Sequence, residues 1–219
     1  MAQPGRLSDT ARVEAFSDGV FAIAITLLVL EIRVPAPDAT QHGRALLAAL
    51  RGLWPSYLGY ALSFVTIGIM WANHHSIFHY VRRADRYFVL INVLFLMCIS
   101  FLPFPTALLA EYLPEPGGRT LAVAGYSATL VVIALAYNAL WWYAVAGDRL
   151  LAPDYDRDAV RTISRRYAAG PISYAVSFGL AFVNVWASLA VHALLAALYL
   201  LPEHRRAAHA AASPSRRTA

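Results

Sequence analysis

Several runs of about twenty predominantly apolar residues divide the chain, and a run of that length is what a helix needs to cross the hydrocarbon core of a bilayer. Hydrophobic residues make up 59% of the 219 residues and charged residues only 14%. A soluble domain has roughly 45–50% apolar and 25% charged residues, and one of this size could not hide so much apolar surface. We therefore expect an all-α, multi-pass protein of the cell membrane.

The apolar runs, separated by turns and charged segments, predict six membrane-spanning helices. Their expected positions are about 13–33, 45–72, 87–112 and 119–146, with a fifth and sixth in 162–202. The last two are expected to separate near Asn184, because a single helix over that region would exceed an ordinary bilayer. Glycine and proline residues in the second span predict that it is bent or closely packed. The first run is too polar for a cleaved signal peptide, so we expect it to be retained.

The distribution of arginines predicts the orientation. All 18 basic residues are arginines, and 14 of them fall in cytoplasmic segments if the N-terminus is cytoplasmic and the chain crosses six times. This bias follows the positive-inside rule and places both termini in the cytoplasm. A net positive charge can also indicate nucleic-acid binding. Because these arginines lie in short segments between apolar runs, no nucleic-acid partner is expected. We expect residues 1–202 to form the membrane domain and 203–219 a disordered basic tail.

The first span carries polar residues into an apolar segment, in the stretch "RVEAFSDGVFAIAITLLVLE" from Arg12 to Glu31. A charged side chain in the hydrocarbon costs about 2.5 kcal/mol or more, so Asp18 must point into protein. Alternatively, Ser17 or Asp18 could cap the start of the helix. On a helical wheel, an apolar stripe with one adjacent hydroxyl lies roughly opposite Asp18. Its members are Ile23, Leu27, Leu30 and the hydroxyl-bearing Thr26. Periodicity alone also allows this stripe to face lipid or the core.

Polar residues elsewhere lie at a depth comparable to that of Asp18. The second span ends in "WANHHSIFHY", with Trp71, His74 and His75, and the third span contains Asn92. Hydrogen bonds among these groups would satisfy atoms that are costly to bury unpaired. The histidines could also sense protons. His75 and His79 are four residues apart, but no third ligand accompanies them, so we expect neither a metal nor a cofactor.

The first span closely resembles the signature of the transmembrane protein 175 family, the bacterial relatives of an endolysosomal potassium channel. The family pattern Arg-x-x-x-Phe-Ser-Asp is matched by Arg12, Phe16, Ser17 and Asp18. Later segments are also similar to the family, namely Trp71 with "NHH" and "DRYFVLINVLFLMCISFLPFPTALLAEY". The resemblance covers roughly residues 10–202.

The resemblance implies a homotetramer of six-helix subunits in which the first helix lines a central pore. It implies an apolar constriction at Ile23, Leu27 and Leu30 and a hydroxyl layer at Thr26, without a carbonyl-ring filter. No "TVGYG"-like run is present, in agreement with that expectation. The structural polar network around the helix is expected to comprise Arg12, Phe16, Ser17, Asp18, Trp71, His74, His75 and Asn92.

These observations favour a potassium-selective cation channel with potassium ions and the lipid bilayer as partners. The alternative is a proton channel or proton-coupled transporter that uses Asp18 and the His74/His75 cluster. An enzyme is not expected, because no nucleophile–base spacing or metal motif accompanies the histidines. An assembly protein that conducts nothing is disfavoured by the polar motif in the first span.

Overall fold

The computed structural model describes residues 8–36, 43–148, 150–152 and 155–200, and the expected tail at 203–219 lies outside them. These residues form an all-helical bundle with no strand beyond an isolated bridge between Val81 and Leu151. The elements are α1 (Ser8–Leu27), η1 (Leu28–Glu31), α2 (Gly43–Gly52), α3 (Trp54–Tyr80), α4 (Arg86–Phe101), α5 (Pro103–Tyr112), α6 (Arg119–Val145), η3 (Ala146–Asp148), α7 (Arg157–Ala181) and α8 (Val185–Leu200).

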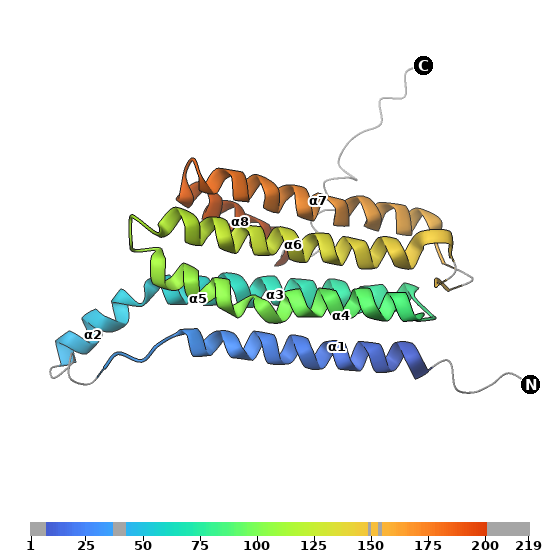
Figure 1. Cartoon of the computed structure of the whole chain (residues 1–219), viewed down its shortest axis with the longest axis horizontal. Helices are drawn as coiled ribbons and strands as arrows, with labels where there is room; N and C mark the ends of the chain where they lie inside the picture. The colour runs from blue at the N-terminus through green and yellow to red at the C-terminus, as the bar shows by residue number, and fades with distance from the viewer. Residues whose placement is uncertain (1–7, 37–42, 149, 153–154, 201–219) are drawn as a thin grey trace, which may run out of the picture.

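The long helices run side by side along the long axis, with α1 at one edge (Figure 1). Helix α1 contacts α3 and α4, and α6 packs between α4 and α7. The start of α1, the α3–α4 turn and the α6–α7 connection lie at one end of the bundle (Figure 1). The interior contains large side chains that are fully buried, among them Phe88, Phe95, Tyr126 and Trp141. This core fixes the positions of α3 and α4, against which α1 packs.

Three helical segments of the described residues are long and apolar enough to cross a membrane, namely Thr10–Glu31, Arg86–Tyr112 and Arg119–Asp148. A fourth is obtained if Ala45–Gly52 and Trp54–Tyr80 count as one span, bent by 42°. The bend expected in the second span is therefore present. The α7 and α8 helices do not meet the same criterion, since arginines occupy the first half of α7 and α8 has only 16 residues.

The expected break near Asn184 is confirmed, and its cause is a helix cap. The Asn184 side-chain oxygen accepts hydrogen bonds from the backbone N–H groups of Trp186 (2.9 Å) and Ala187 (3.1 Å). These donors would otherwise be unpaired at the start of α8. The chain thus turns back after α7 instead of continuing as one long helix.

Two helices extend beyond the membrane spans that the apolar runs predicted. Helix α1 begins at Ser8, before the predicted start near 13, and α3 continues to Tyr80, past the predicted end near 72. No proline or glycine interrupts the histidine-rich end of α3. The next helix, α4, starts with a cap in which the Asp85 carboxylate accepts from the Phe88 N–H at 2.8 Å.

Candidate functional site

Helix α1 and its 3-10 continuation η1, described together as the α1 stripe below, have one buried and one uncovered face. The buried face consists of Ser17, Phe21, Ala24 and Leu28, spaced by three or four residues and packed against α3 and α4. On the other side, Ile23, Leu27 and Leu30 are 62%, 42% and 69% exposed. No described helix of the same subunit covers these apolar residues, which therefore lie outside the core that the described residues form. They are left to contact lipid, another subunit or a pore.

The Thr26 hydroxyl lies on the uncovered side and bonds only to its own helix. Its Oγ1 atom lies 2.9 Å from the carbonyl oxygens of both Ala22 and Ile23. Because a hydroxyl has a single hydrogen, this hydrogen is shared between the two carbonyls and the oxygen lone pairs remain free to accept. Thr26 can therefore offer an oxygen to a cation without losing its bonds to the helix.

A buried hydrogen-bonded chain joins α1, α4 and α3 beneath this helix. The Ser17 hydroxyl donates to the Val13 carbonyl (2.7 Å) and accepts from the Asn92 amide nitrogen (2.9 Å). The Asn92 amide oxygen, 2.8 Å from His74 Nε2, can only accept, so His74 carries its proton on Nε2. His74 Nδ1 has no partner in the described part of the chain.

Aromatic rings enclose this chain and hold the imidazole in place. The His74 ring stacks on Phe95 with centroids 5.6 Å apart and contacts Phe21 at 5.4 Å and Phe78 at 5.1 Å. Ser17, His74 and Asn92 are all fully or almost fully buried. Rotating α1 about its axis would break the Ser17–Asn92 bond and displace Phe21 from this packing. The buried chain thus fixes the rotation of α1.

Asp18 is held by a different neighbour. Its carboxylate accepts a hydrogen bond of 2.8 Å from the Trp71 indole nitrogen on α3, and no bond joins it to Ser17, His74 or Asn92. The helix-cap alternative for Ser17 and Asp18 is wrong, because α1 begins at Ser8 and both residues lie well inside it. The half-buried carboxylate of the first span is thus paired through an indole N–H.

A second pair of interacting side chains, Glu14 and His75, lies one helical turn away from Asp18 and Trp71. The sequence analysis did not predict it. Glu14 Oε1 is 2.8 Å from His75 Nδ1. Glu14 and Asp18 are four residues apart on α1, as are Trp71 and His75 on α3, so the two pairs form an antiparallel ladder between the helices. The spacing of four in both segments was the sequence signal. Arg12 and Phe16 lie outside these contacts, on the exposed side of α1.

A further buried polar cluster, also missed, lies away from α1. His192 Nε2 on α8 lies 2.8 Å from the Ser127 hydroxyl on α6 and 2.9 Å from the Ser177 hydroxyl on α7. Ser177 and Ser188 also bond to each other's backbone carbonyls, at 3.0 and 2.8 Å. These bonds fasten α7 and α8 to α6. Serines are too common in membrane helices to reveal such a partnership from sequence.

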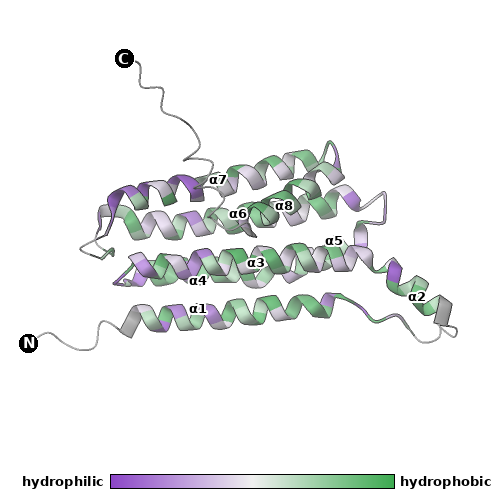
Figure 2. Cartoon of the chain, turned by 180° about the vertical axis from the view of Figure 1, so that it is seen from behind, coloured by the Kyte–Doolittle hydropathy of each residue, from purple (hydrophilic) through white to green (hydrophobic). Residues whose placement is uncertain are grey.

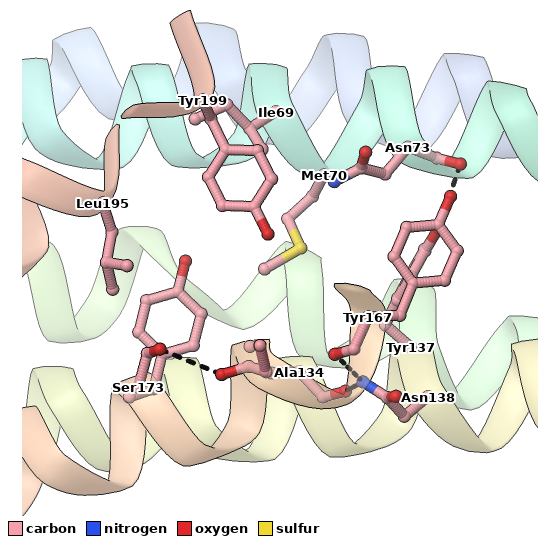
Figure 3. Close-up of a pocket in the computed structure, with 13 residues that line it drawn as sticks. Ile69, Met70, Asn73, Ala134, Tyr137, Asn138, Tyr167, Ser173, Leu195 and Tyr199 are labelled. Atoms are coloured by element: carbon pink, nitrogen blue, oxygen red, sulfur yellow. Dashed lines mark hydrogen bonds between the residues drawn. The ribbon is translucent and has the colours of Figure 1, made fainter. Parts of the chain in front are cut away.

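A cavity of about 120 Å³ lies between α3, α6, α7 and α8, with tyrosines prominent in its wall (Figure 3). The Tyr137 hydroxyl donates to the Asn73 carbonyl (3.0 Å), and the Asn138 amide donates to the carbonyls of Ala134 and Tyr167 (2.8 and 3.0 Å). No residue of α1 lines this cavity. It is therefore separate from the uncovered α1 stripe.

The chain is similar to proteins of one family of channels. The family model described as endosomal/lysosomal potassium channel TMEM175 matches residues 12–103. A potassium channel of Streptomyces collinus is 46% identical over 209 residues, which is 95% of this chain and 100% of that protein. The endosomal/lysosomal proton channel TMEM175 of Gallus gallus is 36% identical over 79% of this chain but 36% of its own length.

A solved structure has the same fold. The crystal structure of a lysosomal potassium-selective channel TMEM175 homolog from Chamaesiphon minutus superposes with a TM-score of 0.80 at 46% sequence identity. The match covers 88% of this chain and 96% of that one. The likeness thus extends over most of the chain.

Proposed function

The chain belongs to the TMEM175 family, and from that premise we propose that it is a potassium-selective channel of the cell membrane, with α1 lining a central pore. The observation that carries the pore assignment is the uncovered apolar stripe at Ile23, Leu27 and Leu30. Its position at the edge of the bundle allows several copies of α1 to meet around one axis (Figure 1). The finer proposal is a homotetramer of six-span subunits with both termini in the cytoplasm, in which α7 and α8 are the last two spans.

The constriction works by excluding water. Rings of isoleucine and leucine side chains in a narrow pore disfavour a continuous water column, so the pore conducts only when it widens or its helices rotate. The buried chain Ser17–Asn92–His74 supports this role, because it holds α1 in one rotation. The Glu14–His75 and Asp18–Trp71 contacts add a second attachment at the same end.

We attribute the selectivity for potassium over sodium to the easier dehydration of potassium and to the Thr26 hydroxyl. Potassium is larger than sodium and loses water more easily, so an apolar ring favours potassium among partly dehydrated cations. The Thr26 oxygen can replace part of the lost hydration, since its lone pairs are free. No carbonyl ring is needed in this scheme.

The test is to record currents of the reconstituted protein in asymmetric potassium and sodium, with Ile23→Asn beside the wild type. A polar ring at the constriction should favour wetting and therefore raise conductance or lower selectivity. Val29→Asn is the matched control, because Val29 is 51% exposed in η1, which continues α1, but lies about a third of a turn away from Ile23. Equal effects of both changes, or no current in the wild type, would refute the pore assignment.

A second candidate function is proton conduction or proton-coupled transport through Asp18 and the His74/His75 cluster. The observation that favours it is the Glu14–His75 pair beside Asp18 and Trp71, which places several titratable groups at one level. A vertebrate relative is named a proton channel. Proton uptake into liposomes that is abolished by Asp18→Asn, while potassium current persists, would assign protons to this path.

A further inference from the structure

An open cavity of about 620 Å³ lies where α6 ends and α7 begins, far from the uncovered stripe of α1. Its wall combines arginines with apolar and hydroxyl-bearing side chains, namely Val145, Asp148, Tyr155, Arg157, Val160, Arg161, Ser164 and Arg165. Figure 2 shows hydrophilic residues concentrated in this first part of α7. The proposed pore makes no use of this cavity.

The three arginines of the cavity differ in their partners. Arg157, Arg161 and Arg165 follow one another at intervals of four residues, so they share one face of α7. Arg157 Nη2 is 3.5 Å from the Asp148 carboxylate. Within the described ranges, Arg161 and Arg165 have no carboxylate within 4 Å, and both are exposed. The described side chains that line the cavity therefore carry an excess of two positive charges.

Two neighbouring charged side chains, Asp156 and Arg166, already have partners. Asp156 caps α7, accepting from the N–H groups of Asp158 (2.9 Å) and Ala159 (3.1 Å). The backbone N–H groups at the start of α7 are therefore not available to bind an anion in the cavity. The Arg166 guanidinium lies over the ring of Tyr199, 5.7 Å from its centre, and Arg166 does not line the cavity. An anion in the cavity would thus meet Arg161 and Arg165.

The cavity lies at the depth expected for lipid headgroups. The apolar span Arg119–Asp148 ends there, and Trp142, in the last turns of α6, is more than half exposed. Exposed aromatic rings of this kind mark the membrane–water interface. The indole nitrogen of Trp141 donates to Ser164 in the cavity wall at 2.8 Å, which ties the cavity to α6. Val145 and Val160 supply an apolar side suited to the glycerol and upper acyl chain of a lipid.

We propose that this cavity binds the phosphate of an anionic membrane lipid, with Arg161 and Arg165 as its donors. A guanidinium presents paired N–H groups that match two phosphate oxygens. Basic pockets between membrane helices are suited to anionic headgroups for this reason. The bound lipid bridges the end of α6 and the start of α7, whatever ion the protein conducts.

The experiment is native mass spectrometry of the full chain purified in detergent and supplied with equal amounts of phosphatidylglycerol and phosphatidylcholine. The wild type should retain phosphatidylglycerol in preference. In the double variant Arg161→Gln/Arg165→Gln the preference should fall by about fivefold for each arginine removed, the factor expected for about 1 kcal/mol per basic residue near a membrane surface. Arg166→Gln, which removes one positive charge next to the cavity, should keep the preference.

Two further arms make the result decisive. The pair Arg161→Lys/Arg165→Lys keeps the charge and should retain more phosphatidylglycerol than the glutamine pair, so that general loss of structure is distinguished from loss of the site. Inorganic phosphate at the same concentration as the lipid should not displace it. An unchanged preference in the glutamine pair, an equal loss in Arg166→Gln, or displacement by inorganic phosphate would each overturn the proposal.

Discussion

At the residue scale, Thr26 is the polar residue of the uncovered α1 stripe whose role is most open to test. Its hydroxyl bonds only to backbone oxygens of its own helix. Thr26→Ala should therefore leave the subunit stable and lower the potassium-to-sodium permeability ratio by about fivefold, the factor that about 1 kcal/mol of polar contact supplies. Reversal potentials in bilayers measure this ratio. Thr26→Ser keeps the hydroxyl and should preserve the ratio, and an unchanged ratio in Thr26→Ala would exclude the hydroxyl from selectivity.

Asn92 is the residue on which the buried chain depends, because its amide bonds to both Ser17 and His74. Asn92→Ala should destabilise the protein by about 1–3 kcal/mol, since it leaves a buried imidazole N–H without a partner. Thermal unfolding in detergent measures the loss. Ser76→Ala is the control, because the Ser76 hydroxyl is exposed and bonds only to its own helix. Similar melting temperatures for the two variants would show that the buried chain contributes little.

The sequence predicted part of this residue-scale picture. That Ser17, Asp18, Trp71, His74 and Asn92 lie at one depth followed from the positions of the apolar runs. Which of them pair did not follow, because Ser17 and Asp18 are adjacent in sequence yet point to different neighbours, one to Asn92 and the other to Trp71. A difference of 100° around a helix decides between these partners, and that angle has meaning only once α3 and α4 are placed.

At the element scale, α1 is attached to α3 by the ladder of Glu14–His75 and Asp18–Trp71. Trp71→Phe should weaken this attachment by about 1 kcal/mol, the usual net value of a hydrogen bond, because Asp18 keeps its charge but loses its donor. Chemical unfolding in detergent tests the change. Trp142→Phe, at another half-exposed tryptophan, is the control. If both substitutions have the same effect, the loss reflects the aromatic surface and the indole N–H bond is not needed.

The hydrophobic pattern of the sequence predicts the membrane-embedded part of a helix better than it predicts the helix ends. Apolar runs mark the part of a helix that lies in lipid, so the expected 119–146 agrees closely with α6 (Arg119–Val145). They do not mark helical residues outside the lipid, which is why α1 and α3 extend beyond the predicted spans. Helix α7 is the extreme case, since its first half is rich in arginine and its second half apolar. Its helical continuity depends on packing against α6 and on the Asp156 cap.

At the scale of the whole molecule, the uncovered stripe of α1 is the strongest argument that one subunit is incomplete. A lipid-facing helix needs no apolar stripe distinct from the rest of its surface, because lipid accepts any apolar face. Here, however, the polar side of α1 is bonded into the subunit, and Thr26 is left on the uncovered side next to Ile23 and Leu27. A hydroxyl in that position is better placed toward a water-containing axis than toward acyl chains.

This assembly can be tested by cross-linking, because the chain has a single cysteine, Cys98. In a Cys98→Ala background, Ile23→Cys should form disulfide-linked dimers on mild oxidation in membranes, since copies of α1 around a narrow axis bring this position close to itself. Val132→Cys on α6 is equally apolar and similarly exposed but lies on a helix outside the proposed pore, and it should remain monomeric. Dimers from Val132→Cys and none from Ile23→Cys would mean that the subunits meet through a different face, and that α1 faces lipid.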